Sequence, residues 1–143
     1  MKRLLIITFL ALSFSLSAQK IWTAKQANDW YAKQRWLVGC NFIPSTAINE
    51  LEMWQADTFD ASTIDRELGW AEGLGFNVVR VYLHNLLWET DKEGFKKRIN
   101  DFLTLTDKRK IKVLFVLFDD CWLSDPKPGK QPDPIPGVHN SGW

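Results

Sequence analysis

The amino-acid sequence predicts an α/β fold built on a parallel sheet. Expected strands begin at residues 36, 77 and 111, and helical patterns fill the two intervals between them. This order of strand, helix, strand, helix, strand is typical of right-handed βαβ crossovers. The third expected strand, 111–118, is almost continuously apolar, which indicates burial on both faces of a sheet covered by helices. Three strands make a thin open sheet, so we expect the front part of a larger fold, cut inside its third βα loop.

Residues 1–18 have the layout of a secretory signal peptide. The segment begins with two basic residues, continues with the apolar run 4–16 and ends in small residues. The apolar run is too short and wrongly flanked for a membrane span. We therefore expect cleavage near Ala18, a secreted or periplasmic mature chain of residues 19–143, and no membrane contact after cleavage.

Composition and motifs argue against several classes of partner. The formal net charge of +1 argues against nucleic acid or an anionic membrane. No glycine-rich phosphate loop follows an expected strand, and no Ser-centred elbow motif is present. His84 and His139, taken with Asp119 and Asp120, lack the short helical spacing of zinc enzymes. We therefore expect no metal and no cofactor, and the oligomeric state is left open.

Cysteine and tryptophan usage leaves two questions open. Cys40 and Cys121 could form a disulfide in an exported protein or remain two buried thiols, and their places at the ends of apolar strands favour free thiols. The chain has eight tryptophans, whose flat faces suit sugar rings. For any single tryptophan, a place in the core is the better expectation.

The first elements are a helix and a strand. Thr23 and Gln26 have capping-box spacing, which predicts a helix over 23–34. The run 36–42 predicts the first strand. The connection 46–59 is neither clearly helical nor clearly extended, and we expect a functional loop there.

A second helix and the central strand follow. Ser62 and Asp65 fit a capping box for a helix over 62–74, and we expect Gly75 to end it in the left-handed conformation. In the strand 75–84, alternation separates two faces. One face is wholly apolar and should lie against helices: Val79, Val81 and Leu83. The other face carries Val78, Arg80, Tyr82 and His84.

The last helix is expected over 93–108, with an apolar stripe that begins at Phe95 and a charged face in water. The charged face contains Lys96, Lys97, Arg98 and Asp101. Residues 123–143 have no periodicity and contain five prolines and three glycines. A loop of this length is usually functional or disordered.

Polar side chains gather at the carboxyl ends of the three expected strands. The first strand ends in Asn41, the second in Arg80, Tyr82 and His84, and the third in Asp119, Asp120 and Trp122. The carboxyl ends of parallel strands carry the working groups of α/β proteins. The pattern favours a polar, aromatic-walled cleft. The alternative is that Arg80 belongs to a structural ion pair, because a charge in the middle of a strand is costly unless it is paired.

Carboxylates for acid–base chemistry are scarce. Glu89, Asp119 and Asp120 are available, but adjacent aspartates point to opposite faces of a strand. A glycosidase needs two carboxyl groups about 5–5.5 Å apart for retention and about 6.5–9.5 Å apart for inversion. No such pair is evident, so we expect no catalytic residue in this chain.

Five motifs resemble the start of secreted bacterial glycoside hydrolases of the cellulase-like clan A, close to family 5. They are Glu52-Met53-Trp54-Gln55, Thr58-Phe59-Asp60, Gly75-Phe76-Asn77-Val78-Val79-Arg80-Val81, Phe118-Asp119-Asp120-Cys121-Trp122 and His139-Asn140-Ser141-Gly142-Trp143. The resemblance implies a (β/α)₈ TIM barrel, of which this chain covers about the first three βα units, and a retaining hydrolase of the cellulase, xylanase or mannanase type acting on β-linked polysaccharide or oligosaccharide. A barrel of this kind has about 250 residues.

The resemblance also implies roles for individual residues. Arg80 matches the arginine that borders the nucleophile, and Asp119, Asp120 and Trp122 fall where the third strand lines the substrate cleft. Asn41, Tyr82, His84 and His139 are the further candidates for carbohydrate contact. Both catalytic glutamates are expected after Trp143, so the chain from Met1 to Trp143 alone should not hydrolyse a substrate.

Two other interpretations stay open. The chain could be a non-catalytic carbohydrate-binding protein, which the tryptophan count favours. It could also be a structural α/β domain without activity, in which Arg80 is an internal ion-pair partner.

Overall fold

The computed structural model describes residues 21–117, 125–138 and 141–142. The chain divides into two compact units, one ending at Arg35 and one beginning at Trp36. The first unit contains helix α2 (Ala24–Ala32), which has no buried residue. Its capping box is confirmed: the Gln26 N–H donates to Thr23 Oγ1 at 3.2 Å, and the Thr23 N–H donates to Gln26 Oε1 at 2.9 Å.

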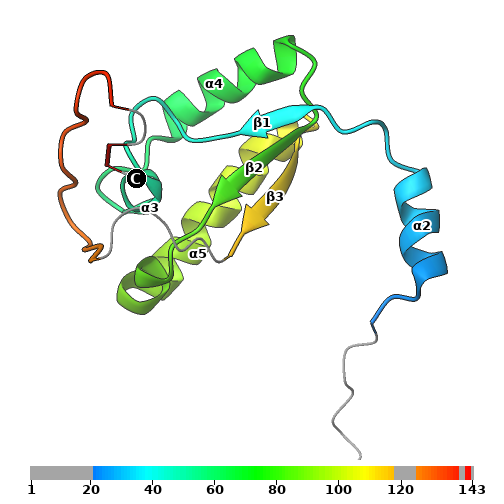
Figure 1. Cartoon of the computed structure of the whole chain (residues 1–143), viewed down its shortest axis with the longest axis horizontal. Coiled ribbons are helices and arrows are strands. Elements are labelled where there is room, and N and C mark those ends of the chain that lie inside the picture. Colours follow the sequence, from blue (N-terminus) through cyan, green and yellow to red (C-terminus); the bar gives the residue numbers. More distant parts are fainter. Residues whose placement is uncertain (1–20, 118–124, 139–140, 143) are drawn as a thin grey trace, which may run out of the picture. The chain divides into compact units, whose positions relative to one another are not determined.

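The second unit contains a parallel sheet of three described strands in the order β1-β2-β3 (Figure 1). The strands are β1 (Gly39–Asn41), β2 (Val78–Tyr82) and β3 (Lys112–Val116). Gly39 lies opposite Val78, and Val78 lies opposite Lys112. The predicted parallel α/β arrangement is therefore confirmed, although each strand is shorter than its apolar run in the sequence.

The predicted (β/α)₈ barrel is wrong as a description of this chain. The described residues form a small α/β unit whose sheet is open, with β1 and β3 as edge strands. The physical reason for the error is that a βαβ pattern specifies parallel pairing between neighbours, which open sheets and closed barrels share. The pattern carries no information on whether the sheet closes.

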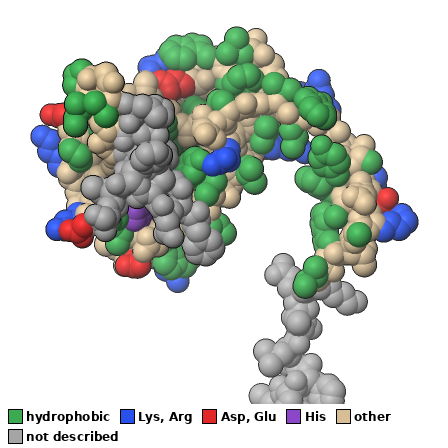
Figure 2. All heavy atoms as spheres, in the orientation of Figure 1, with side chains coloured by type: hydrophobic (Ala, Val, Ile, Leu, Met, Phe, Trp, Pro, Cys, Tyr) green, Lys and Arg blue, Asp and Glu red, His purple; other side chains and the backbone are tan. Residues whose placement is uncertain are grey.

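Helices cover one face of this sheet. They are α3 (Glu50–Trp54), α4 (Ala61–Gly73) and α5 (Asn85–Lys108), and together with the strands they enclose one core cluster. Val79 and Val81 share that face and are 0% exposed, as the apolar alternation predicts. The expected burial of the third strand on both faces is wrong, because Leu114 on the opposite face is 57% exposed. Figure 2 shows hydrophobic side chains at the surface among basic and other polar ones.

Helix α3 was not evident in the sequence, where the connection 46–59 has no clear periodicity. Asn49 caps the helix by accepting from the Glu52 N–H at 2.9 Å. Trp54 at its carboxyl end is 0% exposed. Its ring lies within 6.0 Å of the rings of Phe59, Phe95 and Phe102. A five-residue helix is too short to show a 3.6-residue period, so its tertiary contacts stabilise it.

The start of α4 differs from the predicted one. Asp60, and not Ser62, is the N-cap, and its carboxylate accepts from the Thr63 N–H at 2.9 Å. The pKa of Asp60 is lowered first by a hydrogen bond from the Thr63 side chain and then by the one from the Thr63 backbone. The carboxyl end of α4 is as predicted, because Gly75 has the expected left-handed conformation, with a φ of 85°.

Helix α5 begins earlier than predicted and is kinked at Asp91, where φ is −149° and ψ is 58°. The Asp91 carboxylate accepts from the Gly94 N–H at 3.2 Å and so caps the second helical stretch. The predicted solvent-facing position of Arg98 is wrong: Arg98 is only 8% exposed. Its Nε donates to the Trp54 carbonyl at 2.5 Å and its Nη2 to Asp91 at 2.8 Å. These partners, distant in sequence, compensate for the burial of the charge.

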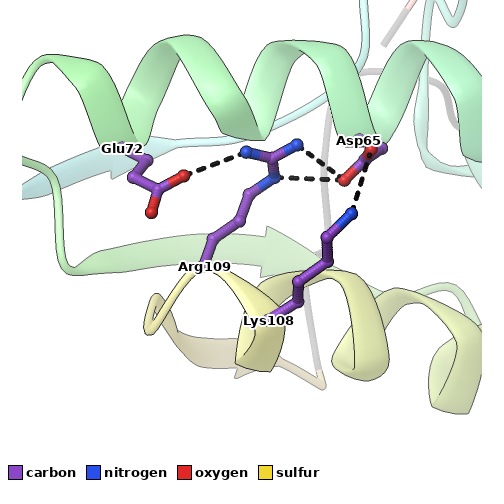
Figure 3. A network of polar contacts seen from close by, with 4 residues as sticks. All are labelled: Asp65, Glu72, Lys108 and Arg109. Carbon is purple, nitrogen blue, oxygen red and sulfur yellow. Dashed lines mark hydrogen bonds and ion pairs between the residues drawn. The ribbon is translucent and has the colours of Figure 1, made fainter.

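An ion-pair network joins α4 to the end of α5 (Figure 3). Arg109 donates to Asp65 at 2.7 and 3.1 Å and to Glu72 at 2.9 Å, and Lys108 Nζ lies 3.8 Å from Asp65. The hydrogen bond from Arg109 is the main cause that holds the pKa of Asp65 below its ordinary value. The network fixes the two helices against each other at the amino-terminal end of β3. No described helix is long and apolar enough to cross a membrane.

Candidate functional site

The face of the sheet away from the helices carries three of the predicted site residues. Asn41 and Arg80 are register partners on neighbouring strands, and Tyr82 follows Arg80 on the same face of β2. The Arg80 guanidinium carbon lies 4.8 Å from the centre of the Tyr82 ring. Arg80 Nη2 also donates a hydrogen bond to the Tyr82 hydroxyl. The sheet therefore presents an amide, a guanidinium and a phenol together.

The ion-pair alternative for Arg80 finds no support in the part of the chain that the structure describes. None of the ion pairs found there involves Arg80. The side chain is exposed, and its contacts are with the Tyr82 ring and hydroxyl. Among the described residues, the hydrogen bond found for the Arg80 side chain is the one to the Tyr82 hydroxyl, whereas a guanidinium has five N–H donors.

His84 lies after β2 and caps α5. Its Nδ1 accepts from the Leu86 N–H at 3.2 Å, so the neutral ring carries its proton on Nε2. Burial lowers the pKa of His84, and the charge of Glu89 opposes this effect. The geometry gives this histidine a structural role, and it leaves Nε2 as the donor for any ligand.

This arrangement predicts a pH dependence of stability. The unfolded chain binds a proton at the ordinary imidazole pKa of 6.5, whereas folded His84 binds it only at lower pH. Between the two values the unfolded state binds more protons, so the free energy of unfolding decreases as the pH falls below about 6.5. His84→Asn keeps a good N-cap without a titrating group, and we expect this part of the slope to disappear. Urea unfolding between pH 7.5 and 5.5 measures the effect, and an unchanged slope in the variant would contradict the assignment.

The other predicted site residues lie outside the described residues. They are Asp119, Asp120, Trp122 and His139. The structure thus brings Asn41, Arg80 and Tyr82 together, with His84 two residues further along the chain. Cys40 is a free thiol and is exposed, so the expected burial of this thiol is wrong. The reason is its place on the edge strand β1, and Cys121 is outside the described residues.

Sequence reasoning missed a group of buried amides beside α3. Asn49, Gln55 and Gln131 are buried, and they hold the proline-rich segment against the helix. Trp54 Nε1 donates to the Tyr82 carbonyl at 2.8 Å, which places α3 at the carboxyl end of β2. No pattern in the sequence indicates these amides, because Gln131 lies in a stretch without periodicity.

The described register positions of the exposed sheet face carry side chains that can bind a ligand. The described register positions of this face contain no aspartate or glutamate. They are Gly39, Asn41, Val78, Arg80, Tyr82, Lys112, Leu114 and Val116. Within 21–117, 125–138 and 141–142, no group of three or more His, Cys, Asp or Glu side chains is arranged to hold a metal ion.

Comparisons with protein-family models, with curated proteins and with solved structures found no match for this chain.

Proposed function

We propose that this chain supplies a carbohydrate-contacting part of a retaining glycoside hydrolase that acts on β-linked polysaccharide or oligosaccharide. One observation carries the proposal. Arg80 is exposed on the uncovered face of the sheet, lies over the Tyr82 ring and has Asn41 as its register partner. The resemblance of the strand motif around Arg80 to clan A hydrolases supports the same function.

These side chains suit a sugar ring. A guanidinium offers several N–H donors in one plane, and an amide offers both donors and an acceptor, so neighbouring hydroxyl groups can be bound in pairs. The Tyr82 phenol adds an amphipathic surface. A few polar groups of this kind on a mostly apolar surface are typical of small-molecule sites. Leu114, in register with Arg80, supplies exposed apolar surface beside it.

Hydrolysis with retention needs two carboxyl groups about 5–5.5 Å apart. The described part of the exposed face has none, so in this proposal both catalytic glutamates come from residues after Trp143. Arg80 would border the nucleophile and favour its ionised form through its positive charge. The chain from Met1 to Trp143 should therefore bind saccharide and leave it intact.

Arg80→Ala tests the binding surface. Loss of hydrogen bonds from a charged group should weaken the binding of β-linked oligosaccharides by about tenfold. Titration calorimetry with cello-, xylo- and manno-oligosaccharides measures the change. Arg66→Ala is a matched control, because Arg66 is also exposed and lies 5.4 Å from the centre of the Trp70 ring on α4. Equal affinity in both variants, or no binding by the unaltered chain, would count against the proposal.

A non-catalytic carbohydrate-binding protein is the second candidate, and the lack of carboxylates on the described exposed face favours it. The two candidates differ in the coding sequence expected downstream of the codon for Trp143. An in-frame Asn-Glu at the end of a fourth strand, together with release of reducing sugar by the complete gene product, would support the hydrolase. Binding without hydrolysis by that product would support the binding protein.

A further inference from the structure

The proline-rich segment after β3 is held on the protein by buried amide side chains. Its described part, 125–138 with 141–142, contains neither helix nor strand, yet Gln131 within it is only 6% exposed. Figure 1 shows the segment beside α3, on the side toward which the arrowheads of β1 and β2 point. We call Asn49, Gln55 and Gln131 the amide latch.

Each member of the amide latch makes hydrogen bonds that fix backbone. Gln55 is bound to Gly129 twice: its Nε2 donates to the Gly129 carbonyl at 3.0 Å, and its Oε1 accepts from the Gly129 N–H at 2.5 Å. Gln131 Nε2 donates to the carbonyls of Lys127 and Gly129 at 3.0 and 2.8 Å. The segment is thus held in one conformation although it has no regular structure of its own.

Asn49 connects this network to the helix and to the end of the chain. Its Nδ2 donates to Gln131 Oε1 and to the Gly142 carbonyl, both at 2.8 Å, while its Oδ1 caps α3. All the hydrogen-bonding groups of the Asn49 side chain are therefore engaged. Gly142 packs so closely on Ile48 that a Cβ at this position would lie 2.3 Å from Ile48 Cδ1.

Two residues of the amide latch belong to the ends of α3, and α3 is hydrogen-bonded to the carboxyl end of β2, where Tyr82 lies. Asn49 and Gln55 are the two caps of α3, and Trp54 between them donates to the carbonyl of Tyr82. Hydrogen bonds thus join α3 both to the carboxyl end of β2 and to the segment. Buried and satisfied polar networks of this kind specify one arrangement, since a broken one leaves buried groups without partners.

We propose that the amide latch makes the described segment 125–138 with 141–142 a preformed side wall of the saccharide site, and that Gln131 is a positioning residue for this wall. The saccharide part of this inference rests on the proposed function. The ordering of the segment by Gln131 does not depend on the proposed function. The test therefore measures both amide hydrogen exchange and saccharide affinity.

Gln131→Glu is the decisive variant, because glutamate matches glutamine in shape but lacks the Nε2 donors. We expect amide hydrogen exchange within 125–138 to become at least about tenfold faster, while exchange in β2 and α5 is unchanged. The affinity for the tightest β-linked oligosaccharide should fall about fivefold, and Gln131→Leu should have the same two effects. Gln34→Leu is the matched control, since Gln34 also donates to a backbone carbonyl, that of Trp30, but belongs to the other unit.

The outcomes separate the two proposals. Unchanged exchange in 125–138 would overturn the amide latch, whatever the sugar affinity. Faster exchange with unchanged sugar affinity would overturn the role of the segment as a wall, while the effect of Arg80→Ala would still decide the proposed function. If the unaltered chain binds no saccharide, the wall and the proposed function both fail, and faster exchange would then support the ordering role of Gln131 alone.

Discussion

Gly39→Ala is expected to lower the free energy of unfolding by about 3 kcal/mol or more and to separate β1 from β2. A Cβ at this position would lie 1.7 Å from the carbonyl oxygen of Val78 and 2.7 Å from its carbonyl carbon. Both atoms belong to the backbone of the central strand, so no side-chain movement relieves the clash. Because Asn41 and Arg80 are register partners two residues further on, the variant should also disturb the candidate site.

Gly73→Ala is the matched control for this prediction. Gly73 is the last residue of α4, has nothing within 4 Å of a Cβ, and does not have a positive φ. The same substitution should therefore raise the free energy of unfolding by about 0.5–1 kcal/mol. Urea unfolding followed by circular dichroism measures both variants. If Gly39→Ala and Gly73→Ala changed the free energy of unfolding by similar amounts, the close approach of β1 and β2 at Gly39 would be wrong.

Trp54→Ala is expected to cost about 3–5 kcal/mol, because it removes a large and fully buried side chain from the centre of the core. The indole ring contacts aromatic rings from the following loop and from α5, with centroid distances of 6.0 Å to Phe59, 5.9 Å to Phe95 and 5.4 Å to Phe102. Truncation to alanine would leave these three rings around a cavity. Chemical unfolding at equilibrium measures this loss.

Trp54→Phe separates the two contributions of this residue. Phenylalanine keeps much of the aromatic packing but loses the Nε1 donor to the Tyr82 carbonyl. We expect a cost of about 1–3 kcal/mol, because the partly buried Tyr82 carbonyl loses this donor. If Trp54→Ala and Trp54→Phe were equally stable, the assignment of Trp54 to the core centre would be wrong.

Short-range patterns allowed the correct parts of the fold to be predicted. The capping box of Thr23 and Gln26 needs only three residues of spacing, and the buried face of β2 needs only alternation between Val79 and Val81. Parallel pairing follows from the order of the elements. The adjacency of Asn41 and Arg80 was predictable for the same reason, since parallel strands bring their carboxyl ends to one edge.

Long-range contacts decided the parts that could not be predicted. Arg98 has the spacing of a solvent-facing charge, and its burial depends on Trp54 and Asp91 from other parts of the chain. The amide latch depends on residues 82 positions apart, Asn49 and Gln131, which no periodicity relates. Closure of the sheet is likewise a property of the whole fold, so a local βαβ pattern was compatible with a barrel that the described chain does not form.

The open edge of β3 has a consequence for how the chain behaves among other copies of itself. No described strand pairs with β3 on the side away from β2, and the strand contains the apolar run Val113 to Val116. An unprotected, hydrophobic strand edge is a template for further β-strands from other molecules. Charged side chains disfavour such pairing, and Lys110 and Lys112 lie next to this apolar run.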